Sequence, residues 1–244
     1  MARAVKIRSR LVGALMCGVV AISVVAVPAG AAVPAKGSGS GKLVGTFEVT
    51  NGAAADSGTV PTGSYFRMVQ PGGTVDAGPF VPNADSLSPD KTYSLLAPGT
   101  DGGLTTGKYQ PQPNPAFDSQ GNGLATAILL PTKFFGVDFA VSTDPTVPQT
   151  DTATKKPKVT VDKKGALSGN LSAFGVAYSN QDFNQGSPKP DGSKPTGTTG
   201  PTGTYDAKTG EYTLDWSSSI IGGPFDGFTG VWHLEGTFQK AKKR

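Results

Sequence analysis

His233 is the single histidine of this 244-residue chain, so any chemistry that needs an imidazole depends on it. It stands in GGPFDGFTGVWHLEGTFQ, residues 222–239, with Asp226 before it and Glu235 after it. A catalytic histidine needs a nucleophile or a metal within reach. The patterns that supply such partners, His-Glu-x-x-His and Gly-x-Ser-x-Gly, are missing from the sequence. We therefore assign no catalytic residue.

The histidine stretch alternates between two sets of residues. The apolar set is Trp232, Leu234, Gly236 and Phe238, whereas His233 and Glu235 belong to the other set. Successive side chains of a strand point to opposite faces. The pattern therefore predicts a strand that buries the apolar set and leaves the imidazole facing water, with Glu235 beside it on the same face.

Paired carboxylates are the enzyme chemistry that needs no histidine, because a glycosidase uses two acidic groups roughly 5 to 10 Å apart. The candidates are Asp138, Glu211, Asp215, Asp226 and Glu235. Acidic side chains are also ordinary on the water-facing side of a β-sheet, and the sequence favours no pair among them. A carboxylate-dependent secreted hydrolase acting on glycans is therefore kept as the alternative function.

A run of amides around an aromatic residue is the most suggestive binding feature. It comprises Tyr178, Asn180, Gln181, Asp182, Phe183, Asn184 and Gln185. Amide side chains donate and accept hydrogen bonds, and an aromatic face covers C–H groups, a combination that suits a sugar or a peptide. The run opens an expected loop over residues 179–203, and long loops in compact domains are often functional. We predict these seven residues to bind a ligand.

Aspartates in the Pro- and Gly-rich segment 74–118 raise the question of calcium, which takes six to eight oxygen ligands. The four are Asp76, Asp85, Asp90 and Asp101. Their spacing matches no calcium-loop pattern, so we interpret them as turn residues. We predict neither a metal nor a cofactor.

Short alternating runs separated by Gly, Pro, Asn and Asp indicate how these residues are held. Expected strands cover residues 43–50, 63–70, 123–131, 133–143, 158–162, 166–178 with a bulge, 203–216 as a hairpin, and 229–239. A further hairpin is expected at 117–124. The chain is therefore predicted to be all-β, a mainly antiparallel sandwich or barrel with long Gly/Pro-rich loops, after an N-terminal signal helix. Gly-Thr-Phe recurs at 45–47 and 236–238, and we expect these two strands to pair and remove an open edge.

The N-terminus carries an export pattern. Four basic residues precede an apolar run over residues 11–27, and the small residues 29–31 fit a signal-peptidase site. Met16 precedes Cys17, the single cysteine, so the small residue that a lipoprotein signal needs there is missing. We predict a signal peptide over 1–31, a flexible linker over 32–42, a single β domain over 43–239 and a basic tail over 240–244. The mature chain is then secreted or extracellular, with no transmembrane anchor.

The charge of +4 belongs to the two ends of the chain. Residues 36–239 hold 14 basic and 18 acidic residues, whereas the last five residues include Lys240, Lys242, Lys243 and Arg244. We therefore expect no nucleic-acid partner for the folded body. The tail suits a weak, salt-dependent association with the anionic cell wall.

Six segments carry a resemblance to known proteins. They are TGSYFRMVQPGG, GPFVPNADS, APGTDGGLTTGKYQPQP, KFFGVDFAVST, FNQGSPKPDGS and GPFDGFTGVWHLEGTF. Together they make most of residues 43–239 resemble uncharacterised secreted proteins of high-GC Gram-positive, actinobacterial type. The resemblance implies export but brings no assigned activity, so no residue role is carried over. The leading hypothesis is a secreted, non-catalytic β-domain that binds a cell-wall polymer, a glycan or a protein, or has a structural role.

Overall fold

The structure, a computed structural model, describes residues 40–55 and 60–242. The predicted signal peptide, most of the predicted linker, and Lys243 and Arg244 of the basic tail lie outside these ranges. Within them the chain is all-β and forms no helix, as predicted. In particular, the described part holds no helix long and apolar enough to cross a bilayer.

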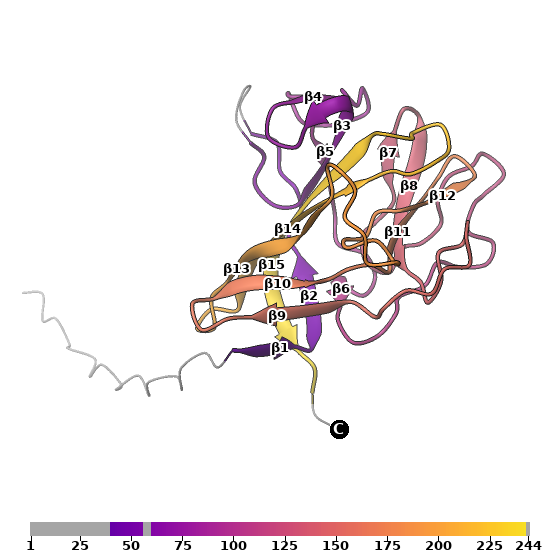
Figure 1. The fold of residues 1–244 in the computed structure, drawn as a ribbon. Coiled ribbons are helices and arrows are strands. Elements are labelled where there is room, and N and C mark those ends of the chain that lie inside the picture. Colours follow the sequence, from indigo (N-terminus) through magenta and orange to yellow (C-terminus); the bar gives the residue numbers. More distant parts are fainter. Residues whose placement is uncertain (1–39, 56–59, 243–244) are drawn as a thin grey trace, which may run out of the picture. The chain divides into compact units, whose positions relative to one another are not determined.

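Most strands belong to one large antiparallel sheet that curls into a half-barrel (Figure 1). Its main path runs β1 (Gly41–Leu43), β9 (Lys158–Val161), β10 (Ala166–Asn170), β13 (Thr199–Tyr205), β14 (Glu211–Ser219), β15 (Thr229–Lys240), β2 (Gly45–Val49) and β6 (Gly103–Thr105). Off this path, β3 (Tyr65–Thr74) pairs with β15, β4 (Gly78–Phe80) and β5 (Ser94–Leu95). The sheet therefore branches at β15, whose first half pairs with β3 and whose second half pairs with β2.

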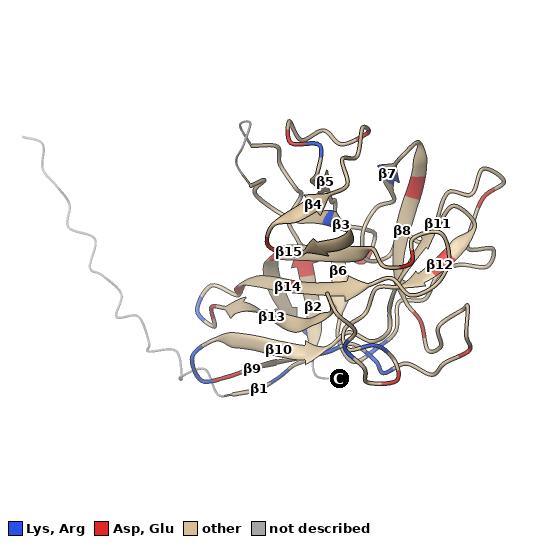
Figure 2. Ribbon diagram, turned by 45° about the horizontal axis from the view of Figure 1, so that its top comes forward, with Lys and Arg blue, Asp and Glu red and all other residues tan. Residues whose placement is uncertain are grey.

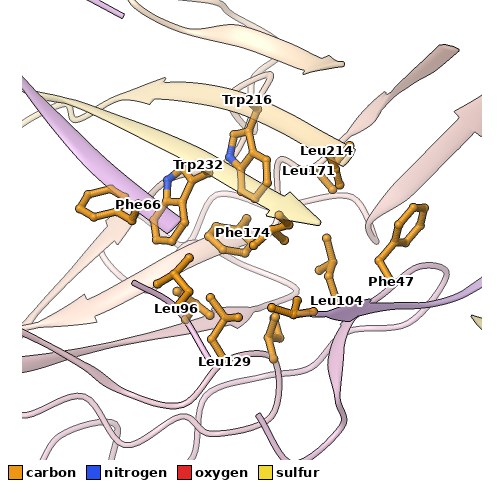
Figure 3. Packing of buried hydrophobic residues seen from close by; sticks show 14 of the residues in the cluster. Phe47, Phe66, Leu96, Leu104, Leu129, Leu171, Phe174, Leu214, Trp216 and Trp232 are labelled. Atoms are coloured by element: carbon orange, nitrogen blue, oxygen red, sulfur yellow. The ribbon is translucent and has the colours of Figure 1, made fainter. Parts of the chain in front are cut away.

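A second, four-stranded antiparallel sheet has the order β12 (Gln181–Asn184), β11 (Phe174–Tyr178), β8 (Val137–Thr143) and β7 (Thr132–Phe134). Aromatic side chains fill the space between the two sheets. Trp216 and Trp232 are stacked with ring centroids 5.8 Å apart, and Phe174 from the smaller sheet meets both rings edge-on at 5.0 Å (Figure 3). The two tryptophans come from neighbouring strands at paired positions, which fixes the sheet in register over its core.

The predicted pairing of the first and last long strands is confirmed. Phe47 of β2 lies opposite Phe238 of β15, and their rings are 4.8 Å apart. The predicted hairpin at 203–216 is also confirmed as β13 and β14, joined by a turn that ends at Gly210.

Four expectations about single elements are wrong or incomplete. Residues 123–131 form isolated bridges rather than a strand, because their backbone bonds go to the irregular segment 97–101. Residues 133–143 are a hairpin, with a turn at Phe135 and Gly136 between β7 and β8. Residues 166–178 are two strands in different sheets rather than one bulged strand. The linker predicted to reach residue 42 gives way to β1 at Gly41.

The segment 74–118, expected to be ordered loop with one or two short strands, contains three, β4, β5 and β6. The hairpin expected at 117–124 closes through a single bridge between Phe117 and Gly123. The expected loop over 179–203 begins instead as a tight hairpin between β11 and β12 and ends in β13. The amide run is therefore part of a strand, which decides where its side chains point.

Candidate functional site

The imidazole of His233 lies on the outer face of the large sheet, with strands β14 and β3 on either side of β15. The alternation predicted for this strand is confirmed, because Trp232 and Leu234 are buried and His233 points the other way. The prediction that the ring faces water is wrong. Its side chain is only 16% exposed, since Asp215 of β14 and Tyr65 of β3 occupy the paired positions on both neighbouring strands.

Both nitrogens of the ring have an acidic partner. Nδ1 lies 2.6 Å from Oδ1 of Asp215, and Nε2 lies 3.4 Å from Oε2 of Glu235. The ring of Tyr65 is stacked on the imidazole with centroids 4.7 Å apart. Glu235 is held in turn by the backbone N–H of Gly63, which donates to its Oε1 at 2.6 Å. We call Asp215, His233, Glu235 and Tyr65 the histidine cluster.

The cluster favours a positively charged ring. Burial alone lowers the pKa of His233, but the hydrogen bonds and charges of Asp215 and then Glu235 outweigh burial, so that its pKa is raised. Burial, with smaller contributions from Tyr93 and Asp215, raises the pKa of the Tyr65 hydroxyl to about 12. The two acidic partners therefore favour the protonated form of the imidazole that lies between them.

This geometry leaves the imidazole little freedom for catalysis. A general base must offer a free ring nitrogen to the proton it removes, and both nitrogens are already bonded to carboxylates. The imidazole also fills the space between Asp215 and Glu235. A glycosidase needs that space for the sugar and its water. Asp215 and Glu235 are thus close in space, but each of them is paired with the imidazole of His233.

The other three carboxylate candidates lie in separate places. The backbone of Asp138 bonds to Asn122 and Gly123, and Glu211 accepts from Thr209 beside the β13–β14 turn. Asp226 accepts a bond from the backbone of Gly222 within the β14–β15 loop. Asp138 and Asp226 lie apart from the histidine cluster, whereas Glu211 and Glu235 line one surface groove.

An open, acidic groove runs beside the cluster across β13, β14 and β15. Its volume is about 470 Å³, and it is lined by Thr50, Thr204, Tyr205, Asp206, Glu211, Tyr212, Thr213, Glu235, Gly236 and Thr237. Hydroxyl groups, carboxylates and the partly exposed ring of Tyr205 thus share one surface, and no lysine or arginine lines it. The β13–β14 turn carries one basic residue, Lys208, between Asp206 and Glu211, and further basic positions lie in the turn between β9 and β10 (Figure 2). We call this surface the acidic groove.

The predicted ligand-binding run is divided between the two faces of its hairpin. Tyr178 and Phe183 point into the core, where the Tyr178 hydroxyl donates to the carbonyl of Phe134 at 2.8 Å. Gln185 is buried between the tryptophans: its Oε1 accepts from Trp232 Nε1 at 3.2 Å and its backbone oxygen accepts from Trp216 Nε1 at 3.0 Å.

The remaining four residues of the run lie nearer the surface. Asn180 occupies the tight turn with a φ of 59°, while Gln181, Asp182 and Asn184 are half-buried on β12. Asn184 donates to the carbonyl of Ser172 at 2.8 Å. The seven residues therefore do not line one common site in this structure, and three of them hold the core together.

Asp182 has an acidic neighbour that the sequence did not indicate. Asp182 and Asp144 line the same small crevice, of about 10 Å³. Burial raises the pKa of both carboxyls. Hydrogen bonds from Ser142 and Gln112 to Asp144, and from Gln112 to Asp182, lower these pKa values but do not outweigh burial. No spacing pattern links residues 144 and 182, because they meet only when the smaller sheet assembles.

Lys189 is a second group that sequence reasoning missed. It stands in SPKPDGS, where Pro, Asp and Gly indicate an exposed turn, yet only 6% of the residue is exposed. Burial lowers the pKa of its amine to about 8. A lone lysine among turn residues is also the sequence context of an exposed lysine. The sequence therefore could not distinguish a buried Lys189 from an exposed one.

Of the aspartates of 74–118, Asp90 acts as a turn residue, whereas the side chains of Asp85 and Asp101 bond to residues farther along the chain. Asp90 accepts from the backbone N–H of Thr92 at 2.9 Å, and Asp85 accepts from Gly136 at 2.7 Å. Asp101 accepts from the side chain of Gln110 at 3.0 Å. Across residues 40–55 and 60–242, no group of three or more His, Cys, Asp and Glu side chains is placed to hold a metal ion.

Comparison with protein-family models, with curated proteins and with solved structures finds no match to this chain. The site must therefore be interpreted from its own geometry.

Proposed function

We propose that this chain is an exported, non-catalytic binding module and that the acidic groove is its glycan-binding surface. The observation that carries the proposal is the groove itself, in which hydroxyls, carboxylates and an aromatic ring line one open surface of about 470 Å³. Sugars are bound by such a combination, because hydroxyl and carboxylate groups bond to the sugar hydroxyls and an aromatic face covers its C–H groups. Export is supported by the basic and apolar pattern of residues 1–31.

The charge of the groove narrows the ligand class. Asp206, Glu211 and Glu235 line it without a basic residue among them. An acidic surface repels polyanions and attracts cations. The groove therefore suits neutral or amine-bearing glycans, and it disfavours the anionic polymers of the cell wall.

Titration calorimetry at low salt tests this proposal. The ligands are oligomers of glucosamine, oligomers of N-acetylglucosamine and a sulfated glycan, and a lysine-rich peptide serves as the non-glycan cation. We expect binding in the order glucosamine, N-acetylglucosamine, and none for the sulfated glycan. Glu211→Gln should weaken glucosamine binding by about fivefold. Asp151→Asn, which removes one exposed charge outside the groove, should leave it unchanged.

Two results would contradict the glycan assignment. Binding of the peptide without binding of either amino sugar would assign the groove to a protein partner. Equal affinities of the Glu211→Gln variant and the unaltered protein would place the glycan elsewhere on the surface.

Apart from the acidic groove, which Glu211 and Glu235 both line, the hydrolase alternative is favoured by the shared crevice of Asp144 and Asp182. Two carboxyls with raised pKa values in one crevice match the general-acid requirement of a glycosidase. The crevice volume of about 10 Å³ accommodates no sugar ring, so this alternative ranks second. Turnover on a glycan panel that is abolished in the Asp182→Asn variant would reverse the order.

A further inference from the structure

The amine of Lys189 lies inside the molecule, in the connection between β12 and β13. Its Nζ donates to the backbone oxygen of Asn184 at 2.9 Å and to Ser218 Oγ at 2.7 Å. Ser218 is fully buried, and its hydroxyl donates in turn to the carbonyl of Gly186 at 2.8 Å. The amine is thus held in place by two acceptors, while neither acceptor carries a negative charge.

No carboxylate in the described residues lies within salt-bridge distance of this amine. A buried ammonium without a counter-charge is unfavourable, so the neutral amine gains population. Burial lowers the pKa of Lys189 to about 8, although the charge of exposed Asp191 acts in the opposite direction. Against an ordinary lysine, the neutral fraction near pH 7.5 is greater by roughly 200-fold. The neutral amine is the nucleophilic form.

Lys189 contributes to the lining of a pocket of about 210 Å³. Lys189 and Asn184 are among its lining residues, together with the apolar side chains of Val147, Phe183 and Ile221. A water molecule occupies about 30 Å³ of liquid, so the pocket accommodates a molecule of several non-hydrogen atoms. Ile221 is 63% exposed at this position, so the apolar lining continues to the protein surface.

We propose that Lys189 is an amine nucleophile that captures a small aldehyde or ketone with an apolar substituent from this pocket. The lone pair of Nζ attacks the carbonyl carbon, and the carbonyl oxygen takes up a proton to give a carbinolamine. Loss of water then forms the imine, and hydrolysis reverses both steps, so no oxidant or reductant is consumed. The apolar lining selects the substituent, while Ser218 and Asn184 orient the amine.

Reductive trapping tests the proposal. The full chain is incubated with benzaldehyde and cyanoborohydride at pH 7.5, and the modified lysines are identified and timed by peptide mass spectrometry. Lys164, exposed in the β9–β10 turn, is the internal reference. We expect Lys189 to be modified at least about tenfold faster than Lys164, since the larger neutral fraction outweighs the partial burial. In denaturant the two rates should become equal.

Two variants separate reactivity from structure. Lys189→Arg retains the charge and removes the nucleophile, so modification at this position should disappear while Lys164 reacts as before. Ser218→Ala retains the amine but removes one of its acceptors, and the rate at Lys189 should change without a change at Lys164. Should Lys189→Arg fail to fold, the comparison of Lys189 with Lys164 in the unaltered protein still decides. A rate at Lys189 equal to or below that of Lys164 in the folded protein would overturn the proposal. The amine would then serve only to hydrogen-bond Asn184 and Ser218 within the fold.

Discussion

His233 Nδ1 lies 2.6 Å from Asp215 Oδ1, across the ladder that joins the last two long strands. The two residues occupy directly opposite positions on the outer face of the sheet, and Glu235 approaches the other ring nitrogen from within the same strand. A ring in contact with two carboxylates is an imidazolium by preference. The single histidine of this chain is therefore better suited to stabilise a face of the sheet than to exchange protons with a substrate.

The first prediction concerns the pH dependence of stability. The pKa of His233 in the folded protein is raised above the 6.5 of a free imidazole. The folded state therefore holds its proton more tightly than the unfolded state does. This contribution to the free energy of unfolding is fully present below pH 6.5 and is lost as the pH rises through the folded-state pKa. NMR titration of the single imidazole, with thermal unfolding measured between pH 5 and 9, checks both statements.

Asp215→Asn supplies the matched test. Removing the carboxylate leaves burial acting on the ring, so the pKa of His233 should fall. The variant should lose about 1 kcal/mol of stability at pH 6 and much less at pH 9. A folded-state pKa of 6.5 or lower in the unaltered protein would contradict the charge assignment.

The second prediction concerns Gln185, which joins the hairpin of the smaller sheet to the tryptophan pair. Gln185→Leu retains most of the volume but leaves the indole N–H of Trp232 without its acceptor. We expect a loss of about 1 to 3 kcal/mol in the free energy of unfolding, measured by urea titration with tryptophan fluorescence. Gln120→Leu, at an exposed position, should change stability by less than about 0.5 kcal/mol. Equal losses in the two variants would show that the hydrogen bond from the Trp232 indole to Gln185 does not contribute to the free energy of unfolding.

Sequence reasoning was able to predict the class of fold because strand periodicity and turn residues are local signals. The alternation at 229–239 identified the buried face correctly, and the repeated Gly-Thr-Phe triplet identified the pairing of β2 with β15. The contact between Asp215 and His233 was beyond reach, since the connection of residues 220–228 is too long to fix the register between β14 and β15.

The errors have a common physical origin in long-range partners. Ile128 and Leu129 are fully buried without belonging to a strand, because burial requires an apolar neighbour but no ladder. The change of phase between Leu171 and Phe174 marks the passage from one sheet to the other, and a bulge would give the same local pattern. The amide run was misplaced because Ser179 and Asn180 form a tight turn with positive φ angles of 52° and 59°.

The third prediction concerns the close approach of β15 to β2 at Gly236. A Cβ atom at this position would lie 1.9 Å from the backbone oxygen of Glu48 on the neighbouring strand. Because backbone cannot move aside as a flexible side chain does, Gly236→Ala must separate β2 from β15. We expect a loss of more than about 3 kcal/mol. At Gly175 the nearest atoms lie 3.8 Å from the corresponding Cβ, so Gly175→Ala should be tolerated. Similar melting temperatures for the two variants would refute this account of the contact between β15 and β2.

The last prediction concerns Phe135, which has a φ of 50° beside Gly136 with a φ of 80°. The two residues form the loop between paired Phe134 and Val137, as in a type I′ hairpin, whose first position favours asparagine. Phe135 is a bulky residue in a conformation that it rarely adopts, and 53% of the residue is exposed. It retains one edge contact with Phe134, at 4.8 Å between centroids.

Comparing two variants separates the backbone strain from that contact. Phe135→Ala and Phe135→Asn both remove the aromatic ring, but only asparagine relieves the left-handed backbone. We expect the asparagine variant to be more stable than the alanine variant by about 0.5 to 1 kcal/mol, measured by chemical unfolding. If the two variants unfold at the same denaturant concentration, the turn carries no strain of this kind. The edge contact with Phe134 would then be the one contribution of Phe135 to stability that these variants reveal.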